Sequence, residues 1–288
     1  MRNNIVLNEP LSRHTSWKVG GPADIFFTPN DRNDLSDFLK SNDCIITWLG
    51  NGTNILVRDA GVRGAVISTR KSLNKIELID QSNYLIEVGV SCFELAMYAT
   101  KNNFGPAAFF SGIPGSIGGA LTMNAGCFGQ ETWEFVKSVE VMDRNGEIHQ
   151  LDPEEFSISY RSVSFPFPLW FLSCVMSFPE EGFTTIEELK SMRDSRLERQ
   201  PLTENTCGSV FKNPDGNHAG DLIERSDLKG FRIGGCAVSE KHANFIVNDK
   251  EATARDIETL IKHIQKTVKD RYEIDLETEV RIIGEYRE

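Results

Sequence analysis

The sequence predicts an α+β fold, because candidate strands fill the first part of the 288-residue chain and candidate helices fill the last third. Two local patterns support this. Asn145-Gly146 separates two short apolar runs, which is typical of a β-hairpin with a type I′ turn. Near the C-terminus, apolar residues recur at helical spacing, and these are Ile257, Leu260, Ile261, Ile264 and Val268.

Most elements expected before residue 180 are strands. The two helices expected there span residues 33–40, with Leu35, Phe38 and Leu39 facing inward, and residues 93–102. The expected strands span residues 44–49, 63–69, 76–80, 84–90, 139–142, 148–151 and 170–178. The order of strands before helices places a domain boundary near residue 180.

The chain after residue 180 is more helical. Residues 185–199 are charged and predict a helix that Pro201 ends. Thr253 and Asp256 form a capping-box pattern at the start of the periodic helix. Residues 276–284 predict a last strand in which Leu276, Thr278, Val280 and Ile282 face one way.

The composition is that of an ordinary globular protein, with 40% hydrophobic and 25% charged residues. A formal net charge of -11 makes nucleic acid and anionic lipid unlikely partners. The start has no apolar core of a signal peptide, and no apolar run has the length of a membrane span. The six cysteines are scattered without a CxxC pair, so we expect reduced thiols, a cytoplasmic protein and no metal site.

Two glycine-rich segments stand out, residues 49–64 and 111–131. Glycine allows positive φ and close approach of the backbone, so consecutive amides can form an anion-binding concavity. Short polar side chains that can bond phosphate oxygens lie within them, namely Thr53, Asn54, Ser116 and Asn124. No lysine or arginine lies between Gly112 and Glu131, so dipoles would hold the anion. The competing interpretation is that these glycines serve tight turns and close packing.

Neither segment matches the common nucleotide-binding motifs. The P-loop pattern GxxxxGK[ST] is absent. Gly50-Asn51-Gly52-Thr53-Asn54-Ile55 has isoleucine where the dinucleotide fingerprint GxGxxG needs its third glycine. A doubly wound nucleotide-binding fold is therefore disfavoured.

Seven blocks in order carry a resemblance to a known family. They are TSWKVGGPA (15–23), GNGTNILVRDAG (50–61), GIPGSIGGALTMNAGCFG (112–129), SYRS (159–162), CGSVFKNP (207–214), RIGGCAVSEKHANFIVN (232–248) and ETEVRIIGE (277–285). Together they resemble the UDP-N-acetylenolpyruvoylglucosamine reductases from one end of the chain to the other. About 45 residues separate Arg161 from the fifth block, which is similar to the short subtype that lacks a tyrosine lid over the substrate.

The resemblance implies an FAD-binding fold of the vanillyl-alcohol-oxidase type with a C-terminal α+β substrate-binding domain. The expected domains are a first FAD-binding subdomain at residues 1–70, a second at 71–180, and a substrate-binding domain at 181–288. The last strand, 276–284, is expected to return to the FAD-binding half. The implied reaction is the NADPH-dependent reduction of UDP-N-acetylglucosamine enolpyruvate to UDP-N-acetylmuramate, in the cytoplasmic branch of peptidoglycan synthesis. The implied protein is a monomer or a weak oligomer.

The resemblance also implies site residues. FAD is expected to be non-covalent, since no histidine occurs in Gly50–Asn54. The implied FAD-binding residues are Gly50, Gly52, Thr53, Asn54, Leu56, Gly112, Pro114, Gly115, Ser116, Ile117, Gly119, Asn124 and Ala125. The implied catalytic residues are Arg161 for the substrate carboxylate, Ser209 as proton donor and Glu279 to polarise the enolic intermediate. Lys212 and Asn213 fit binding of the nucleotide sugar, with Lys229 and Lys241 as weaker candidates for the UDP phosphates.

Three other functions remain open from the residues. The main alternative is an FAD-dependent oxidase of a small alcohol or sugar, which shares the two glycine-rich segments but needs no enolpyruvyl site. The others are a non-enzymatic flavin- or nucleotide-binding module and a protein that binds no flavin. Each proposed catalytic residue also has an ordinary interpretation: a surface arginine, a turn serine and an exposed strand glutamate.

Overall fold

A computed structural model of the protein describes residues 4–179, 182 and 184–286. The chain divides into two units. The first comprises Met1–Val6, Phe26–Asn51 and Ala65–Asp194, and the second comprises Leu7–Ile25, Gly52–Gly64 and Ser195–Glu288. The chain therefore alternates between the units along its length. The expected domain boundary at residues 180–181 lies outside the described residues.

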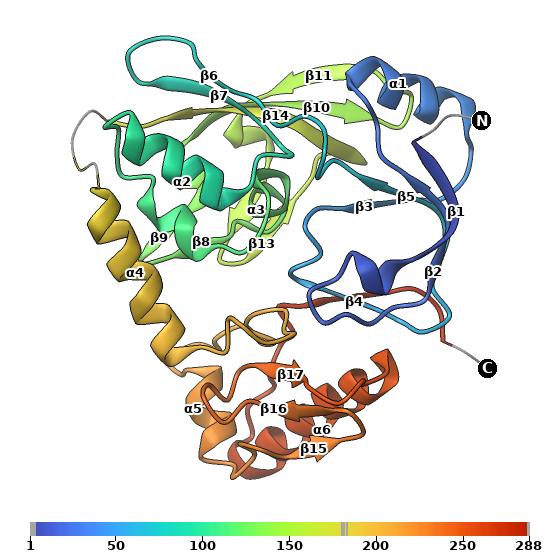
Figure 1. Ribbon diagram of the computed structural model, residues 1–288, viewed down its shortest axis with the longest axis vertical. Coiled ribbons are helices and arrows are strands. Elements are labelled where there is room, and N and C mark those ends of the chain that lie inside the picture. Colours follow the sequence, from blue (N-terminus) through green and yellow to red (C-terminus); the bar gives the residue numbers. More distant parts are fainter. Residues whose placement is uncertain (1–3, 180–181, 183, 287–288) are drawn as a thin grey trace. The chain divides into compact units, whose positions relative to one another are not determined.

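The helices are α1 (Arg32–Ser41), α2 (Cys92–Lys101), α3 (Ile117–Met123), α4 (Ile186–Arg199), α5 (Ala219–Glu224) and α6 (Ala254–Tyr272), with short 3-10 helices η1 (Leu11–Arg13), η2 (Ala108–Gly112), η3 (Thr132–Glu134) and η4 (Pro153–Glu155). Four of the helices lie close to where the sequence places them, whereas α3 and α5 were not predicted (Figure 1). Asp31 caps α1, and the Thr253 and Asp256 capping box opens α6 as expected.

The strands are mostly short. They are β1 (Ile5–Pro10), β2 (Pro22–Phe27), β3 (Ile46–Leu49), β4 (Ile55–Val57), β5 (Val62–Ser68), β6 (Ile76–Leu78), β7 (Asn83–Glu87), β8 (Gly126–Cys127), β9 (Gln130–Glu131), β10 (Val136–Asp143), β11 (Ile148–Leu151), β12 (Ser157–Ser159), β13 (Ser162–Ser164), β14 (Leu169–Ser177), β15 (Arg232–Ile233), β16 (Cys236–Val238), β17 (Ile246–Asn248) and β18 (Arg281–Ile283). One sheet has the order β1-β2-β5-β3, with β3 and β5 parallel.

The first unit is built on an antiparallel sheet of order β11-β10-β14-β7-β6. Strand β14 lies at its centre, and six of its nine residues are buried, which fits its largely apolar sequence. Helices α2 and α3 lie on the same face of this sheet (Figure 1). Aromatic side chains fill the space beneath them, with Tyr84 stacked on Phe104 at 4.0 Å between ring centroids. This sheet supports the second glycine-rich segment, which contains α3.

The β10–β11 hairpin forms as expected, but its expected type I′ turn is wrong. A type I′ turn needs positive φ at both central residues, whereas only Gly146, with φ of 74°, has it. The amide of Gly146 donates to the Asp143 carbonyl, and the Asp143 amide donates to Glu147. The loop therefore has three residues, with Gly146 in the left-handed position. The Asp143 carboxylate explains this, because it accepts from the amides of Asn145 and Glu147.

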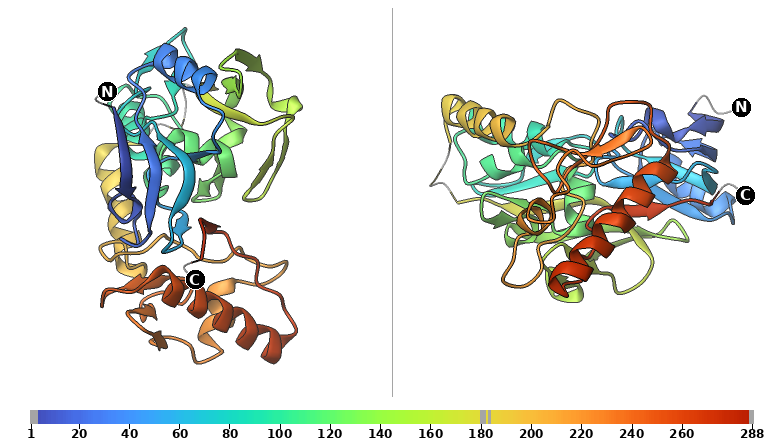
Figure 2. Two further views of the ribbon diagram at one scale, coloured as in Figure 1. Left: turned by 90° about the vertical axis from the view of Figure 1, so that its right-hand side faces the viewer. Right: turned by 90° about the horizontal axis from the view of Figure 1, so that it is seen from below.

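The second unit has its core between α6 and the sheet β15-β16-β17 (Figure 2). The apolar stripe expected from the sequence faces this core, since Ile257, Leu260, Ile261, Ile264 and Val268 are all at most 1% exposed. The expected last strand is shorter than 276–284. Regular pairing covers only Arg281–Ile283, parallel to β4, while Thr278 forms an isolated bridge with Phe211.

Within the described part of the chain, no helix combines the length and the apolar character that a membrane span requires.

Candidate functional site

Ser116 starts α3 and anchors the second glycine-rich segment within the first unit. Its hydroxyl oxygen accepts a hydrogen bond from the amide of Gly119 at 3.3 Å. The amides of Ile117 and Gly118 donate to Val90 and Val88, next to strand β7. A Cβ atom at Gly118 would lie 3.0 Å from the Val88 side chain, so glycine permits this close packing. Packing of this segment thus accounts for some of its glycines.

The two glycine-rich segments meet inside the first unit. A Cβ atom at Gly50 would lie 2.9 Å from the hydroxyl oxygen of Ser116, so a larger residue here would require the serine side chain to shift. Next to it, the side-chain oxygen of Asn51 is buried and has no hydrogen-bond partner among the described residues. A buried polar atom without a partner is costly unless a ligand or water satisfies it. These features fit a bound polar group such as FAD.

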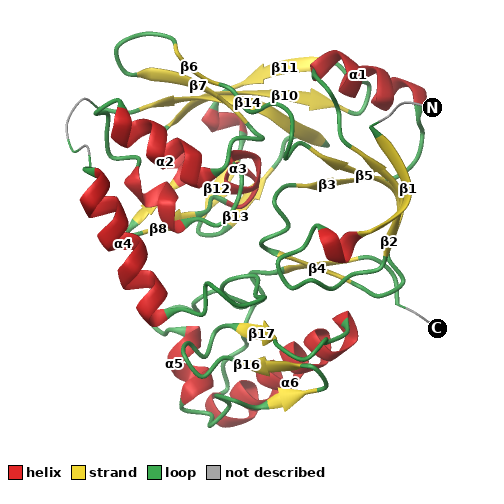
Figure 3. Ribbon diagram, viewed as in Figure 1, coloured by secondary structure: helices red, strands yellow, loops and turns green. Residues whose placement is uncertain are grey.

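Gly52 begins the part of the first segment that belongs to the second unit. A Cβ atom there would lie 1.9 Å from the carbonyl oxygen of His14, and its φ is +67°. The amide of Ser16 donates to the Gly52 carbonyl at 2.9 Å. Figure 3 shows that the chain between β3 and β4 contains neither helix nor strand. The residues before β2 therefore hold this turn in place, a role that the sequence patterns alone did not reveal.

Arg161 occupies the two-residue turn between β12 and β13, and its side chain is only 15% exposed. Its guanidinium donates to the carbonyls of Asn124, at 3.1 Å, and Gly126, at 2.8 Å, and pairs with Glu131 at 3.3 Å. Its φ of 54° is unusual for a residue that is not glycine. The arginine is thus held against the end of the second glycine-rich segment rather than extended into solvent.

The carboxylate of Glu131 joins Arg161 to Asn124. One oxygen pairs with Arg161 and the other accepts from the Asn124 side-chain amide at 2.7 Å. The side-chain oxygen of Asn124 accepts from the amide of Trp133. Asn124 is only 3% exposed, and its side chain bonds other protein groups, although the sequence suggested that it binds phosphate. Glu131 was not singled out from the sequence, because nothing in the residues around it indicates these contacts.

Ser209, Glu279 and Asn54 are connected inside the second unit. The amide of Glu279 donates to the carbonyl of Val210 at 2.8 Å, so the two proposed catalytic residues are joined through the residue after the serine. The side-chain amide of Asn54 donates to the Glu279 carbonyl at 3.1 Å. The first glycine-rich segment is thereby linked directly to the strand-like segment that carries the glutamate.

Ser209 is partly exposed. Gly208, with φ of +77°, precedes it and faces open space. Cys207 is the nearest sulfur along the chain, but burial raises the pKa of its thiol to about 12. Because Cys207 is only 4% exposed whereas Ser209 is partly exposed, the serine is the more accessible of the two side chains.

The remaining expected site residues make protein contacts. Lys212 pairs with Glu277 at 2.6 Å, and the Asn213 side chain accepts from the first amide of α5, at Ala219. Leu56 is fully buried within β4, which pairs with β18. Along the second segment, Gly112 ends η2, Ile117 and Gly119 lie in α3, Pro114 and Gly115 precede Ser116, and Ala125 follows Asn124.

Two family descriptions match the chain. Residues 23–152 match an FAD binding domain, and residues 200–283 match the C-terminal domain of UDP-N-acetylenolpyruvoylglucosamine reductase. These two matches leave only the ends and a middle stretch of the chain uncovered.

Curated relatives extend the likeness over nearly the whole chain. A UDP-N-acetylenolpyruvoylglucosamine reductase of Legionella pneumophila (strain Paris) is 43% identical over 288 residues, covering 99% of this chain and 95% of that protein. One from Methylococcus capsulatus is 45% identical and covers 96% and 92%. The crystal structure of the Thermus caldophilus reductase has a TM-score of 0.82 at 30% identity, covering 99% of this chain and 100% of that one.

Proposed function

The chain belongs to the UDP-N-acetylenolpyruvoylglucosamine reductase family, and from this premise we propose how its own residues perform the reaction. The protein is an FAD-containing oxidoreductase that uses NADPH to reduce UDP-N-acetylglucosamine enolpyruvate to UDP-N-acetylmuramate in peptidoglycan synthesis. The expected α+β fold with an FAD-binding part and a C-terminal substrate domain is confirmed. The alternative of an alcohol or sugar oxidase is not favoured.

FAD, when bound, supplies hydride transfer from NADPH to the enolpyruvyl double bond. The residues proposed to hold it include Gly50, Gly52, Thr53 and Asn54, with Ser116 from the second segment. The close approach of Gly50 to Ser116 and the unpartnered Asn51 oxygen support this assignment. The second segment contains no basic residue between Gly112 and Glu131, so backbone and hydroxyl dipoles would stabilise the FAD phosphates there.

Arg161 is proposed to bind the carboxylate of the substrate. A guanidinium matches two carboxylate oxygens with parallel donors, and its charge does not depend on pH in the working range. Glu131 and two backbone carbonyls already orient this group. An oriented cation next to the carboxylate would stabilise the charge that develops on the adjoining carbon.

Ser209 is proposed to deliver the proton. Hydride adds to the terminal carbon of the enolpyruvyl double bond, and the electron pair of that bond moves to the carbon beside the carboxylate. The hydroxyl O–H bond then breaks as its proton joins that carbon, and water or a neighbouring group restores the hydroxyl proton. A neutral hydroxyl is a weak acid, but the acceptor is a strong base. Glu279 is proposed to polarise the enolic intermediate.

One observation carries this assignment: the Glu279 amide bonds the Val210 carbonyl, and the Asn54 side chain bonds the Glu279 carbonyl. These bonds connect the residue after the proposed proton donor, the glutamate and Asn54 of the first glycine-rich segment within the second unit. Lys212 and Asn213 are proposed to contact the nucleotide sugar, and the chain is proposed to act as a cytoplasmic monomer or weak oligomer. The net charge of -11 supports partners other than nucleic acid or anionic lipid.

Ser209→Ala tests the proton donor. We expect reduction of the bound flavin by NADPH to stay nearly normal, while its reoxidation by the enolpyruvyl substrate slows by about 100-fold or more. Stopped-flow absorbance resolves the two half-reactions. Thr206→Val is the matched control, because it removes a buried hydroxyl without a described partner from the same segment. Equal slowing of both half-reactions by Ser209→Ala would contradict the assignment.

A further inference from the structure

Asn244 is a buried polar residue whose side chain and carbonyl bond the segment after Ser209, while its amide donates to the His242 ring. It is 4% exposed and precedes β17 in the second unit. Its side-chain oxygen accepts from the Phe211 amide at 3.0 Å, and its side-chain nitrogen donates to the Phe211 carbonyl at 2.9 Å. Its own carbonyl accepts from the Val210 amide at 2.9 Å. One residue therefore satisfies three backbone groups of two consecutive residues, Val210 and Phe211.

The opposite edge of the same segment is bonded to the glutamate-bearing stretch. The Glu279 amide donates to Val210, and the Lys212 amide donates to Glu277 at 2.9 Å. In this antiparallel arrangement, the polar groups of Phe211 point to the other side, away from the stretch that carries Glu279. On that side, the Asn244 side chain supplies the hydrogen-bond donor and acceptor that the backbone of a neighbouring strand would otherwise supply.

We infer that Asn244 is a positioning residue that holds Ser209 at a fixed place relative to Glu279, through the backbone of Val210 and Phe211. This rests on the proposed role of Ser209. Gly208, just before the serine, has no side chain, and a Cβ added there would meet no atom within 4 Å, so this residue adds no side-chain contact. The bonds to Asn244 thus restrain the serine from its C-terminal side. A displacement of about 1 Å at a catalytic group costs about 100-fold in rate.

The test compares Asn244 with a matched asparagine. Asn248 lies at the other end of β17, is 7% exposed, and also makes one donor and one acceptor bond to backbone, to Trp17 and Ala252. Asn244→Asp and Asn248→Asp each keep the side-chain volume and lose one donor. Stopped-flow absorbance would follow both half-reactions of the FAD-loaded variants, and thermal unfolding would report stability.

We expect both variants to lower the midpoint of thermal unfolding to a similar extent. Asn244→Asp should slow substrate-dependent flavin reoxidation at least about 10-fold more than NADPH-dependent reduction, with kcat falling more than the KM for the enolpyruvyl substrate changes. Asn248→Asp should slow the two half-reactions equally. Asn244→Ser gives a second variant if the aspartate does not fold. An equal effect of the Asn244 variants on both half-reactions overturns the inference.

A double-mutant cycle separates this inference from the proposed function. If Asn244 acts through Ser209, Asn244→Asp should cause little further slowing of reoxidation in a Ser209→Ala background. Full additivity of the two effects would overturn the inference while leaving Ser209 as proton donor. Normal reoxidation in Ser209→Ala alone would reject the proton donor itself, and the positioning role with it.

Discussion

At the scale of single residues, Arg161 shows how much a side chain depends on neighbours that are distant in sequence. Its guanidinium is fixed by carbonyls of Asn124 and Gly126 and by Glu131, 30 to 37 residues earlier. A forked donor is needed to reach these groups and also to offer bonds to a carboxylate. An arginine in a two-residue turn would otherwise be an ordinary surface residue, as the sequence alone allowed.

Arg161→Lys should therefore be poorly tolerated although it keeps the charge. We expect kcat/KM for the enolpyruvyl substrate to fall by about 10- to 100-fold, because a point charge cannot replace the fork. Steady-state kinetics measure this. Arg32→Lys is the control, since Arg32 is likewise held by ion pairs within the first unit, to Glu140 at 2.7 Å and to Glu87 at 3.6 Å. Comparable losses in both variants would argue against a role in substrate binding.

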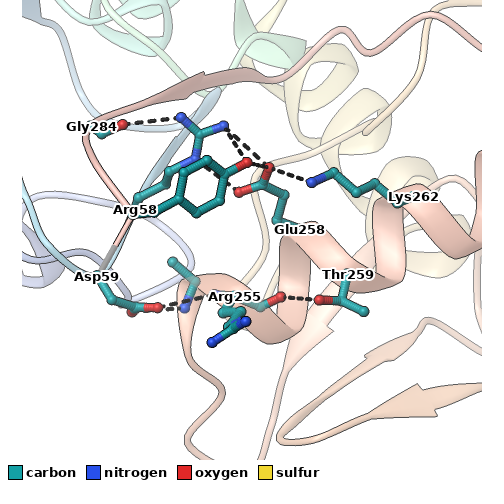
Figure 4. Close-up of polar contacts among 9 residues, drawn as sticks. Arg58, Asp59, Arg255, Glu258, Thr259, Lys262 and Gly284 are labelled. Atoms are coloured by element: carbon teal, nitrogen blue, oxygen red, sulfur yellow. Dashed lines mark hydrogen bonds and ion pairs between the residues drawn. The ribbon is translucent and has the colours of Figure 1, made fainter. Parts of the chain in front are cut away.

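At the scale of elements, α6 is joined to the segment after the first glycine-rich turn (Figure 4). The carboxylate of Asp59 accepts from the first amides of the helix, at Ala254 and Arg255, with distances of 3.0 and 3.1 Å. Arg58 reaches Glu258 one turn later, at 2.9 Å, and donates to the Gly284 carbonyl after β18. Hydrogen bonds therefore connect the helix α6, the loop that carries Arg58 and Asp59, and the end of the last strand.

The ionised Glu258 carboxylate makes the stability of these contacts of α6 dependent on pH. Hydrogen bonds from Arg58 lower its pKa to about 2 from an ordinary value of 4.5, with Tyr286 and Lys262 adding to the effect. Because the folded-state pKa is depressed, its stabilisation is present above about pH 4.5 and is lost as the pH falls toward 2. Glu258→Gln should remove this part of the pH dependence of the unfolding free energy.

Denaturant unfolding between about pH 2 and pH 5 measures that dependence. Glu187→Gln, an exposed glutamate in the first turn of α4, should leave the acid-induced loss of stability unchanged. A wild-type curve parallel to that of Glu258→Gln over this range would show that the cluster does not contribute to acid stability.

At the scale of the whole molecule, bound FAD should stabilise the fold by mass action. At a free FAD concentration of 100 times the dissociation constant, we expect the free energy of unfolding to increase by about 2.7 kcal/mol. This increase should appear as a higher midpoint of thermal unfolding than that of the FAD-free protein. Gly52→Ala should weaken this rise, because its Cβ would collide with the His14 carbonyl. Gly216→Ala is the control, with a similar φ of +70° and open space around it. Equal FAD-induced rises in the two variants would contradict a role of Gly52 in the site.

Local signals were enough for the longer helices and for several strands. The apolar periodicity of α6, its Thr253 cap and the β10–β11 hairpin were all predicted from residues within a few positions of one another, and the structure confirms them. Predictions that needed knowledge of hydrogen-bond partners were less successful. The hairpin turn type was wrong because the Asp143 side chain competes for the turn amides.

The family, its cofactor and its reaction could be predicted from the sequence alone, because ordered blocks of residues carry that information without reference to the chain path. Tertiary structure decided which of those residues touch. Asn54 bonds a residue 225 positions away, and Asn244 bonds one 33 positions away. Such partners depend on how the folded chain returns on itself, and spacing or propensity within a short window does not encode that path.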